Sequence, residues 1–180
     1  DWPQADVRDR ISVDHLLTHT SGLNQYWGPA HAAKAATLDT TAEYGALFHG
    51  DTPAAEPGKH FHYSNNGYVL LGLIAEHLSG MDYYDLVRER IYRPAGMTHS
   101  DHYRRTDSAS GFALGYDTDG KSTTQDMALR GSPAGGGYAS ANDLLRFATA
   151  LEDGKLVSRT TLAAMTTGYA EMGPGMAYGY

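Results

Sequence analysis

The stretch that decides the fold is Pro57-Gly-Lys-His-Phe-His-Tyr-Ser-Asn-Asn-Gly-Tyr-Val-Leu-Leu-Gly-Leu-Ile-Ala-Glu-His-Leu-Ser-Gly80. From Tyr68 to Leu78 its apolar residues follow helical spacing and cover most of the helix circumference, which predicts a core helix. An asparagine side chain accepts hydrogen bonds from free amides of a first helical turn, so Asn65 or Asn66 is expected to cap this helix. Gly80 suits the left-handed residue that ends it.

The residues before that helix alternate in character. Phe61 and Tyr63 fall on one face of an extended segment, and His60 and His62 fall on the other, which predicts a short strand. Residues 63–65 therefore occupy the junction between a strand and a helix. Side chains at such a junction are held by a packed scaffold and remain accessible to a ligand.

Four segments, in order along the chain, resemble motifs of one known family. Tyr63-Ser64-Asn65 resembles the Tyr-x-Asn element of the serine β-lactamase and penicillin-binding-protein superfamily, in its class C β-lactamase, DD-peptidase and esterase branch. Residues 11–23 resemble the helix and turn that precede this element. Residues 88–98 resemble the family's "RIFxPLGMT" segment, and residues 132–138 resemble its "SPAGG" loop. The matches cover nearly the whole chain.

The resemblance implies roles for two residues. In the family, a serine of a Ser-x-x-Lys motif attacks an amide or ester carbonyl, and the tyrosine of Tyr-x-Asn helps to move its proton. By resemblance, Tyr63 is the catalytic proton-transfer residue, and Asn65 orients the substrate and the lysine. A serine hydroxyl needs a base within hydrogen-bond reach, and an asparagine amide offers a donor and an acceptor. Tyrosine, with an ordinary pKa of about 10, acts as that base only where ammonium groups favour its phenolate or relay its proton.

Other interpretations of these residues remain open. Ser64 and Asn66 also fit the Ser-x-Asn motif of the class A branch, although the surrounding segments favour the Tyr-x-Asn register. Without those segments, a packed Tyr63 and a helix-capping Asn65 would explain the pattern. Residues 135–137 are three glycines, but no Gly-Lys-Ser/Thr follows, so we interpret them by resemblance as a turn that lines the site.

Two motifs of the family are missing from these 180 residues. No Ser-x-x-Lys occurs, because the residues three positions before the four lysines are His31, Glu56, Thr118 and Glu152. No Lys-Thr-Gly or His-x-Gly stands near the carboxyl end. We therefore expect residues 1–180 to be a single, truncated domain that is mainly α with a few short strands. It corresponds to the middle, helical domain of the β-lactamase/transpeptidase-like fold, lacking most of the α/β sheet domain, and is predicted to be inactive alone.

Composition excludes several classes of protein. Fourteen basic and twenty-one acidic residues give a net charge of −7, which disfavours a nucleic-acid partner. Hydrophobic residues make up 41% and charged residues 19%, which argues against disorder, and no apolar run is long and uniform enough to span a bilayer. The absence of cysteine excludes thiol catalysis and cysteine-ligated zinc.

The histidines carry only a weak metal signal. His15 and His19 are four residues apart, but Leu16 stands where a His-Glu-x-x-His motif has glutamate, and no third ligand is specified. We expect packing or hydrogen-bonding histidines, and surface positions for His60 and His62. A metal-dependent hydrolase that uses all four is a remote reading, and no metal or cofactor is expected.

Four side chains outside the central stretch are placed to cap helices: Ser12, Thr40, Asp82 and Ser140. The helix after Ser140 is amphipathic, and its expected inward residues are Leu144, Leu145, Phe147, Ala148 and Leu151.

Two functions from different classes fit these observations. The first is a fragment of a serine hydrolase that acts by acyl transfer on a β-lactam, a D-Ala-D-Ala peptide or an ester, with a small-molecule acyl substrate as partner of the whole protein. The second is a non-catalytic binding or regulatory domain of the same fold. Loss of the nucleophile helix would expose apolar surface, so self-association is expected. The resemblance favours a periplasmic or extracellular location.

Overall fold

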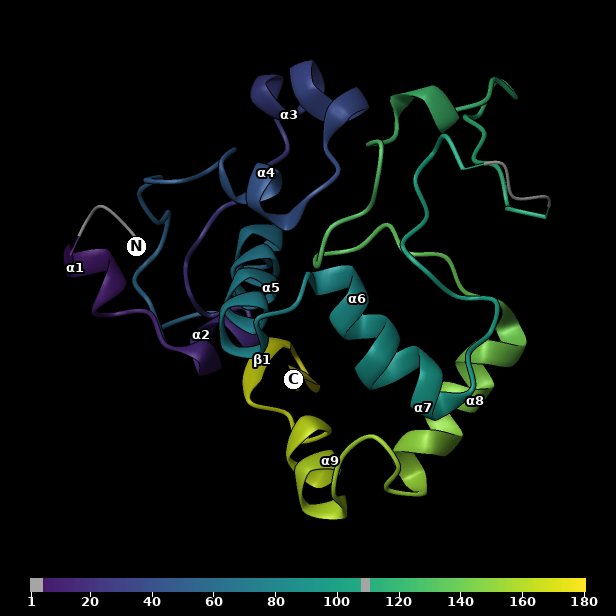
Figure 1. The fold of residues 1–180 in the computed structure, drawn as a ribbon. Helices are drawn as coiled ribbons and strands as arrows, with labels where there is room; N and C mark the ends of the chain where they lie inside the picture. The colour runs from purple at the N-terminus through teal and green to yellow at the C-terminus, as the bar shows by residue number, and fades with distance from the viewer. Residues whose placement is uncertain (1–4, 108–110) are drawn as a thin grey trace.

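Helix α5, Asn65–Ser79, lies at the centre of the computed structural model, which describes residues 5–107 and 111–180 (Figure 1). The other helices are α1 Ala5–Arg8, α2 Val13–Leu17, α3 Pro29–Lys34, α4 Thr41–Gly45, α6 Tyr83–Val87, α7 Arg93–Ala95, α8 Ala141–Glu152 and α9 Arg159–Met165. Short 3-10 segments cover Ala35–Thr37 and Thr124–Asp126, and a π-type turn, Arg88–Tyr92, joins α6 to α7. Strands β1, Ala170–Gly173, and β2, Met176–Tyr178, pair antiparallel. The prediction of a mainly α fold is confirmed.

The four predicted helix caps outside the central stretch are confirmed. Ser12, Thr40, Asp82 and Ser140 each accept a hydrogen bond from a backbone amide in the first turn that follows. The predicted asparagine cap of α5 is wrong. Ser64 is the N-cap, because its Oγ accepts from the amide of Gly67 at 3.0 Å.

The predicted strand before α5 is also wrong. In the described part of the chain, residues 61–64 belong to no strand, and the amide of His62 donates to the carbonyl oxygen of His19 at 2.7 Å. The predicted alternation of faces nevertheless holds for two residues. The rings of Phe61 and Tyr63 both contact the His19 imidazole, at centroid distances of 5.7 and 4.3 Å.

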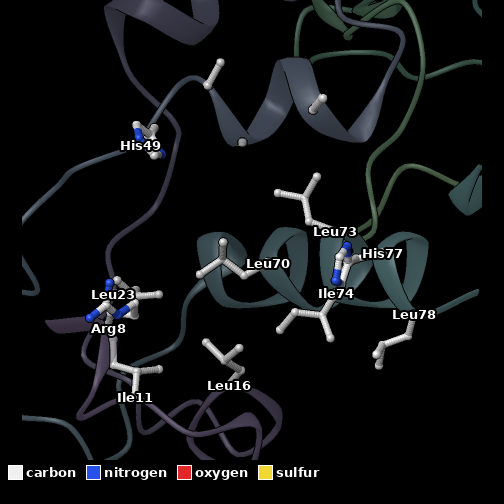
Figure 2. Close-up of a pocket in the computed structure, with 13 residues that line it drawn as sticks. Arg8, Ile11, Leu16, Leu23, His49, Leu70, Leu73, Ile74, His77 and Leu78 are labelled. Carbon is white, nitrogen blue, oxygen red and sulfur yellow. The ribbon is translucent and has the colours of Figure 1, made fainter. Parts of the chain in front are cut away.

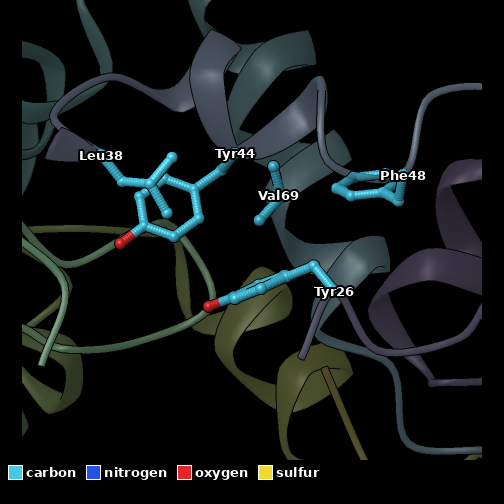
Figure 3. Close-up of a cluster of buried hydrophobic side chains, with 5 residues drawn as sticks. All are labelled: Tyr26, Leu38, Tyr44, Phe48 and Val69. Carbon is cyan, nitrogen blue, oxygen red and sulfur yellow. The ribbon is translucent and has the colours of Figure 1, made fainter. Parts of the chain in front are cut away.

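A mostly aromatic core packs between α4, α5 and the segment before α3 (Figure 3). Its buried members are Tyr26, Leu38, Tyr44, Phe48 and Val69. Two of these tyrosines, together with Tyr84, also hold residues 130–132 through their hydroxyl groups. Tyr44 and Tyr84 donate to the carbonyl oxygens of residues 130 and 131 at 2.5 and 2.7 Å, and the Tyr26 hydroxyl lies 3.2 Å from the Oγ of residue 132. These hydrogen bonds therefore fix the start of the loop at residues 132–138 against the aromatic core.

One face of α5 borders an open apolar groove of about 960 Å³ instead of packed protein (Figure 2). The groove lies between α5, α4 and α2, and its apolar wall includes Leu16, Leu23, Leu70, Leu73 and Ile74. The prediction of a core helix is therefore confirmed only in part. Leu78, near the end of α5, is 80% exposed.

The predicted orientation of α8 is confirmed only in part, since Phe147 and Leu151 are half-buried but Ala148 is exposed. Leu144 and Leu145 are 56% and 68% exposed, whereas Asp143 and Ala150 are buried. The cause is the Asp143 carboxylate, which accepts hydrogen bonds from the amide of His99 and the hydroxyl of Ser100 at 2.6 and 2.8 Å. Because a buried carboxylate must keep its hydrogen bonds, that face of α8 turns inward.

No helix in the described ranges is both long enough and apolar enough to cross a bilayer.

Gly72 provides a test of the packing of α5. A Cβ at this position would clash with the ring of Pro133, whereas a Cβ at Gly67 would meet Leu16 at an ordinary 3.6 Å. Alanine at either position gains about 0.5–1 kcal/mol of helix propensity, but overpacking costs about 1–3 kcal/mol. In urea unfolding, we expect Gly72→Ala to be less stable than wild type and Gly67→Ala to be neutral or more stable. Equal midpoints for the two variants would contradict the close approach of Pro133.

Candidate functional site

The side chain of Gln25 is hydrogen-bonded to the backbone of the junction at residues 63–65. The Gln25 Nε2 donates to the carbonyl oxygen of Tyr63 at 2.5 Å, and the amide of Asn65 donates to the Gln25 Oε1 at 3.1 Å. One planar amide group thus bridges the two ends of the tripeptide. This contact fixes the backbone from which both predicted site residues project.

Ser64, the middle residue, is fully buried and engaged in hydrogen bonds. Its hydroxyl donates to the carbonyl oxygen of Asn24 at 2.8 Å and accepts from the amide of Gly67. Asn66 is also fully buried, and neither the nitrogen nor the oxygen of its side-chain amide has a hydrogen-bond partner among the residues that the structure describes. Tyr63, by contrast, is 50% exposed. This pattern of burial favours the Tyr-x-Asn register over the Ser-x-Asn register, because a residue that meets substrate must be accessible.

His19 lies beneath Tyr63. Its Nδ1 accepts from the amide of Ser64 at 3.1 Å, and its ring lies 4.8 Å from the rings of both Tyr68 and Tyr178. Burial lowers the pKa of His19 below its ordinary value. The prediction of a hydrogen-bonding histidine is confirmed at this position.

A cavity of about 270 Å³ opens beside Asn65. One wall is the chain from residue 126 to 136, which includes part of the glycine turn at residues 135–137, and the other carries Tyr26, Trp27 and His31. Asn65 and that glycine turn, which are far apart in the sequence, therefore border the same space. Tyr63 is outside the set of described residues that line it.

The histidines do not assemble a metal centre in the described ranges. His15 turns its Nδ1 toward the amide of Ser12 at 3.3 Å, and His19 uses its Nδ1 for Ser64. Across residues 5–107 and 111–180, no three histidine, aspartate or glutamate side chains are grouped to hold a metal ion. The metal-dependent reading therefore gains no support.

Gln25 and Asn24 were not predicted from the sequence. They follow the segment at residues 11–23 that carries the resemblance, and they lie in no periodic pattern. Their contacts with residues 63–65 span about 40 positions, so only the folded chain brings them together.

Comparisons with known proteins find matches along nearly the whole chain. A model of the beta-lactamase family matches residues 2–180. The putative penicillin-binding protein PbpX of Bacillus subtilis strain 168 is 32% identical over 173 residues, which are 93% of this chain and 42% of that protein. A penicillin-binding protein structure from Bacillus halodurans gives a TM-score of 0.85 at 28% identity, covering 97% of this chain and 58% of its own. A D-stereospecific amidohydrolase structure from Streptomyces sp. gives 0.80 at 25% identity, covering 99% and 59%. The chain thus spans between 42% and 59% of the length of these relatives.

Proposed function

Because this chain belongs to the beta-lactamase family, we propose that it supplies the helical part of a serine hydrolase that works by acyl transfer. The observation that carries this proposal is the turn at residues 63–65, which is clamped by Gln25 and His19 next to a cavity of about 270 Å³. Held in this way, a half-exposed phenol and an amide present fixed donors and acceptors to a bound substrate. Fixed geometry of this kind is a main source of catalytic rate.

Tyr63 and Asn65 have distinct roles in the proposed reaction. In its phenolate form, the Tyr63 side chain takes the proton of the attacking serine and becomes a phenol, which then gives that proton to the leaving group. Asn65 binds the substrate amide and orients the catalytic lysine. Tyrosine serves as a base at neutral pH only beside a cation, and the ring contact that the structure gives Tyr63 is with the His19 imidazole. By the resemblance to the family, we take this cation to be the lysine of a Ser-x-x-Lys motif in the complete protein.

We propose that the helix with this motif packs into the apolar groove of Figure 2. Its walls are mainly leucine and isoleucine side chains of α2, α5 and the loops beside α2, together with alanine and glycine of α4. Its volume of about 960 Å³ accommodates several large side chains. A helix seated there would cover Leu70, Leu73 and Ile74. Without it, the same surface is available for self-association of the isolated chain.

The substrate belongs to the acyl compounds with an amide or ester carbonyl: a β-lactam, a D-Ala-D-Ala peptide or an ester. The D-stereospecific amidohydrolase among the structural relatives supports inclusion of amides of D-amino acids. The cavity beside Asn65 has aromatic walls, which suit an apolar group on the acyl side of the substrate.

The test is acylation of the protein made from the complete open reading frame, with the 180-residue chain as control. Both proteins are incubated with a fluorescent penicillin and a fluorophosphonate and examined by intact mass. We expect one acyl group per molecule on the complete protein and none on the 180-residue chain. A complete protein that is neither labelled nor active on D-Ala-D-Ala peptides and simple esters would overturn the proposal and favour a binding domain of the same fold.

A further inference from the structure

We propose that His19 is a positioning residue for Tyr63 and Asn65, and that it acts through the lone pair of its Nδ1. The inference rests on the proposed function only in taking Tyr63 and Asn65 as the site residues. His19 lies 45 residues from Ser64 in the sequence, and the one motif considered for it, a metal-ligand pair with His15, does not describe this contact.

His19 makes three contacts with Tyr63 and its two neighbours in the chain. Its carbonyl oxygen accepts from the amide of His62 at 2.7 Å, and its Nδ1 accepts from the amide of Ser64 at 3.1 Å. The backbone amides of the residues on either side of Tyr63 are therefore both hydrogen-bonded to His19. The imidazole ring also lies 4.3 Å from the Tyr63 ring, at an interplanar angle of 38°. His19 thus constrains both the backbone and the ring of Tyr63.

The backbone of His19 is in an unusual conformation. Its φ is +54°, and it is the only residue other than glycine in the described ranges with a positive φ. The left-handed region is sparsely used by residues with a Cβ, and histidine and asparagine tolerate it better than most. A glycine would adopt this conformation without strain but has no Nδ1. Position 19 therefore needs the imidazole acceptor as well as a residue that tolerates a positive φ.

The protonation state of His19 suits this role. Because Nδ1 accepts a hydrogen bond, the neutral ring carries its proton on Nε2. His19 is 2% exposed, and burial lowers its pKa, so the neutral form persists at neutral pH. The imidazole ring contacts the phenol rings of Tyr63, Tyr68 and Tyr178, which lie at centroid distances of 4.3, 4.8 and 4.8 Å.

Three substitutions separate the hydrogen bond from the packing. In His19→Asn, the Oδ1 atom falls close to the position of Nδ1, and asparagine tolerates the positive φ. In His19→Gln, the acceptor falls near Nε2 instead, and in His19→Phe the ring is kept without any acceptor. In the ¹⁵N-labelled 180-residue chain, we expect the Ser64 amide of the glutamine and phenylalanine variants to exchange with solvent about five- to tenfold faster than wild type. The asparagine variant should restore most of the protection.

Equal exchange rates in the asparagine and glutamine variants would overturn the proposal, since a purely space-filling residue would not distinguish them. If a variant fails to fold, the wild-type chain provides the test. A scalar coupling from the Ser64 amide to an unprotonated Nδ1 is expected, and a protonated Nδ1 without coupling would contradict it.

The consequence for catalysis is measured in the complete protein. His19→Gln should lower kcat about tenfold or more with little change in KM, and His19→Asn should recover most of that loss. Exchange and coupling do not depend on turnover. An inactive complete protein that keeps the contrast between asparagine and glutamine would therefore refute the acyl-transfer function and leave the positioning contact intact.

Discussion

Replacing Tyr63 with phenylalanine in the complete protein is expected to lower kcat for acyl transfer by about 10²- to 10⁴-fold, the usual contribution of a positioned proton-transfer group. The substitution removes only the phenol oxygen. The ring that contacts His19 at 4.3 Å is retained, so the fold should be unaffected. Steady-state hydrolysis of a D-Ala-D-Ala peptide and of an ester, together with the unfolding midpoint, separates the two effects.

A matched control is Tyr116→Phe, which removes a phenol oxygen from another exposed tyrosine. Its kcat should stay within about threefold of wild type, because surface substitutions away from a site have small effects. The assignment of Tyr63 would be wrong if Tyr63→Phe and Tyr116→Phe had equal activity in a protein that is otherwise acylated. A loss of stability in Tyr63→Phe would instead indicate that Tyr63 has a structural role, which is the alternative interpretation of its motif.

Replacing Tyr44 with alanine is expected to destabilise the chain by about 3–5 kcal/mol, the usual cost of deleting a large buried side chain. Tyr44 is 2% exposed in the aromatic core, and its hydroxyl binds the carbonyl oxygen of Arg130. Tyr44→Phe keeps the ring and leaves that carbonyl without its partner, which should cost about 1–3 kcal/mol. Urea unfolding of the two variants divides the total between the ring and the hydroxyl.

Tyr116→Ala serves as the control for this series, because its ring is 61% exposed. We expect its free energy of unfolding to change by less than about 0.5 kcal/mol. A Tyr44→Ala variant within 1 kcal/mol of wild type, on the scale of about 3–5 kcal/mol expected for core truncation, would show that the core of Figure 3 does not support the fold.

The N-terminal ends of helices were predictable where the capping contact joins residues close together in the sequence. Ser12 and Thr40 each cap a helix through a bond to an amide three residues later, so a few successive residues decide the outcome. At α5 the same reasoning failed, because Ser64 and the two asparagines after it are all good caps. Contacts from His19 and Gln25 decided among them by holding the backbone at Ser64.

The two proposed site residues stand in a sequence motif, but their surroundings could not be predicted from the sequence. Tyr63 and Asn65 stand in a motif that resembles a family, whereas Gln25 and His19 reach them across 38 to 45 positions. Periodicity along one segment carries no information about such contacts. The same limit explains the error at α8, where the hydrogen bonds of Asp143 to a distant turn outweighed the apolar pattern.

The tyrosine hydroxyls that hold residues 130–132 also bear on the order of folding. Tyr44 and Tyr26 are 86 and 106 residues from their partners in that segment. Contacts between such distant residues must close a large loop before they stabilise anything, so they form late. During synthesis, the turn at Tyr63 and its clamp can assemble as soon as α5 has emerged. The cavity beside Asn65 gains its second wall only after the chain has been made past residue 136, so a nascent chain passes through a stage with an ordered turn and no binding cavity.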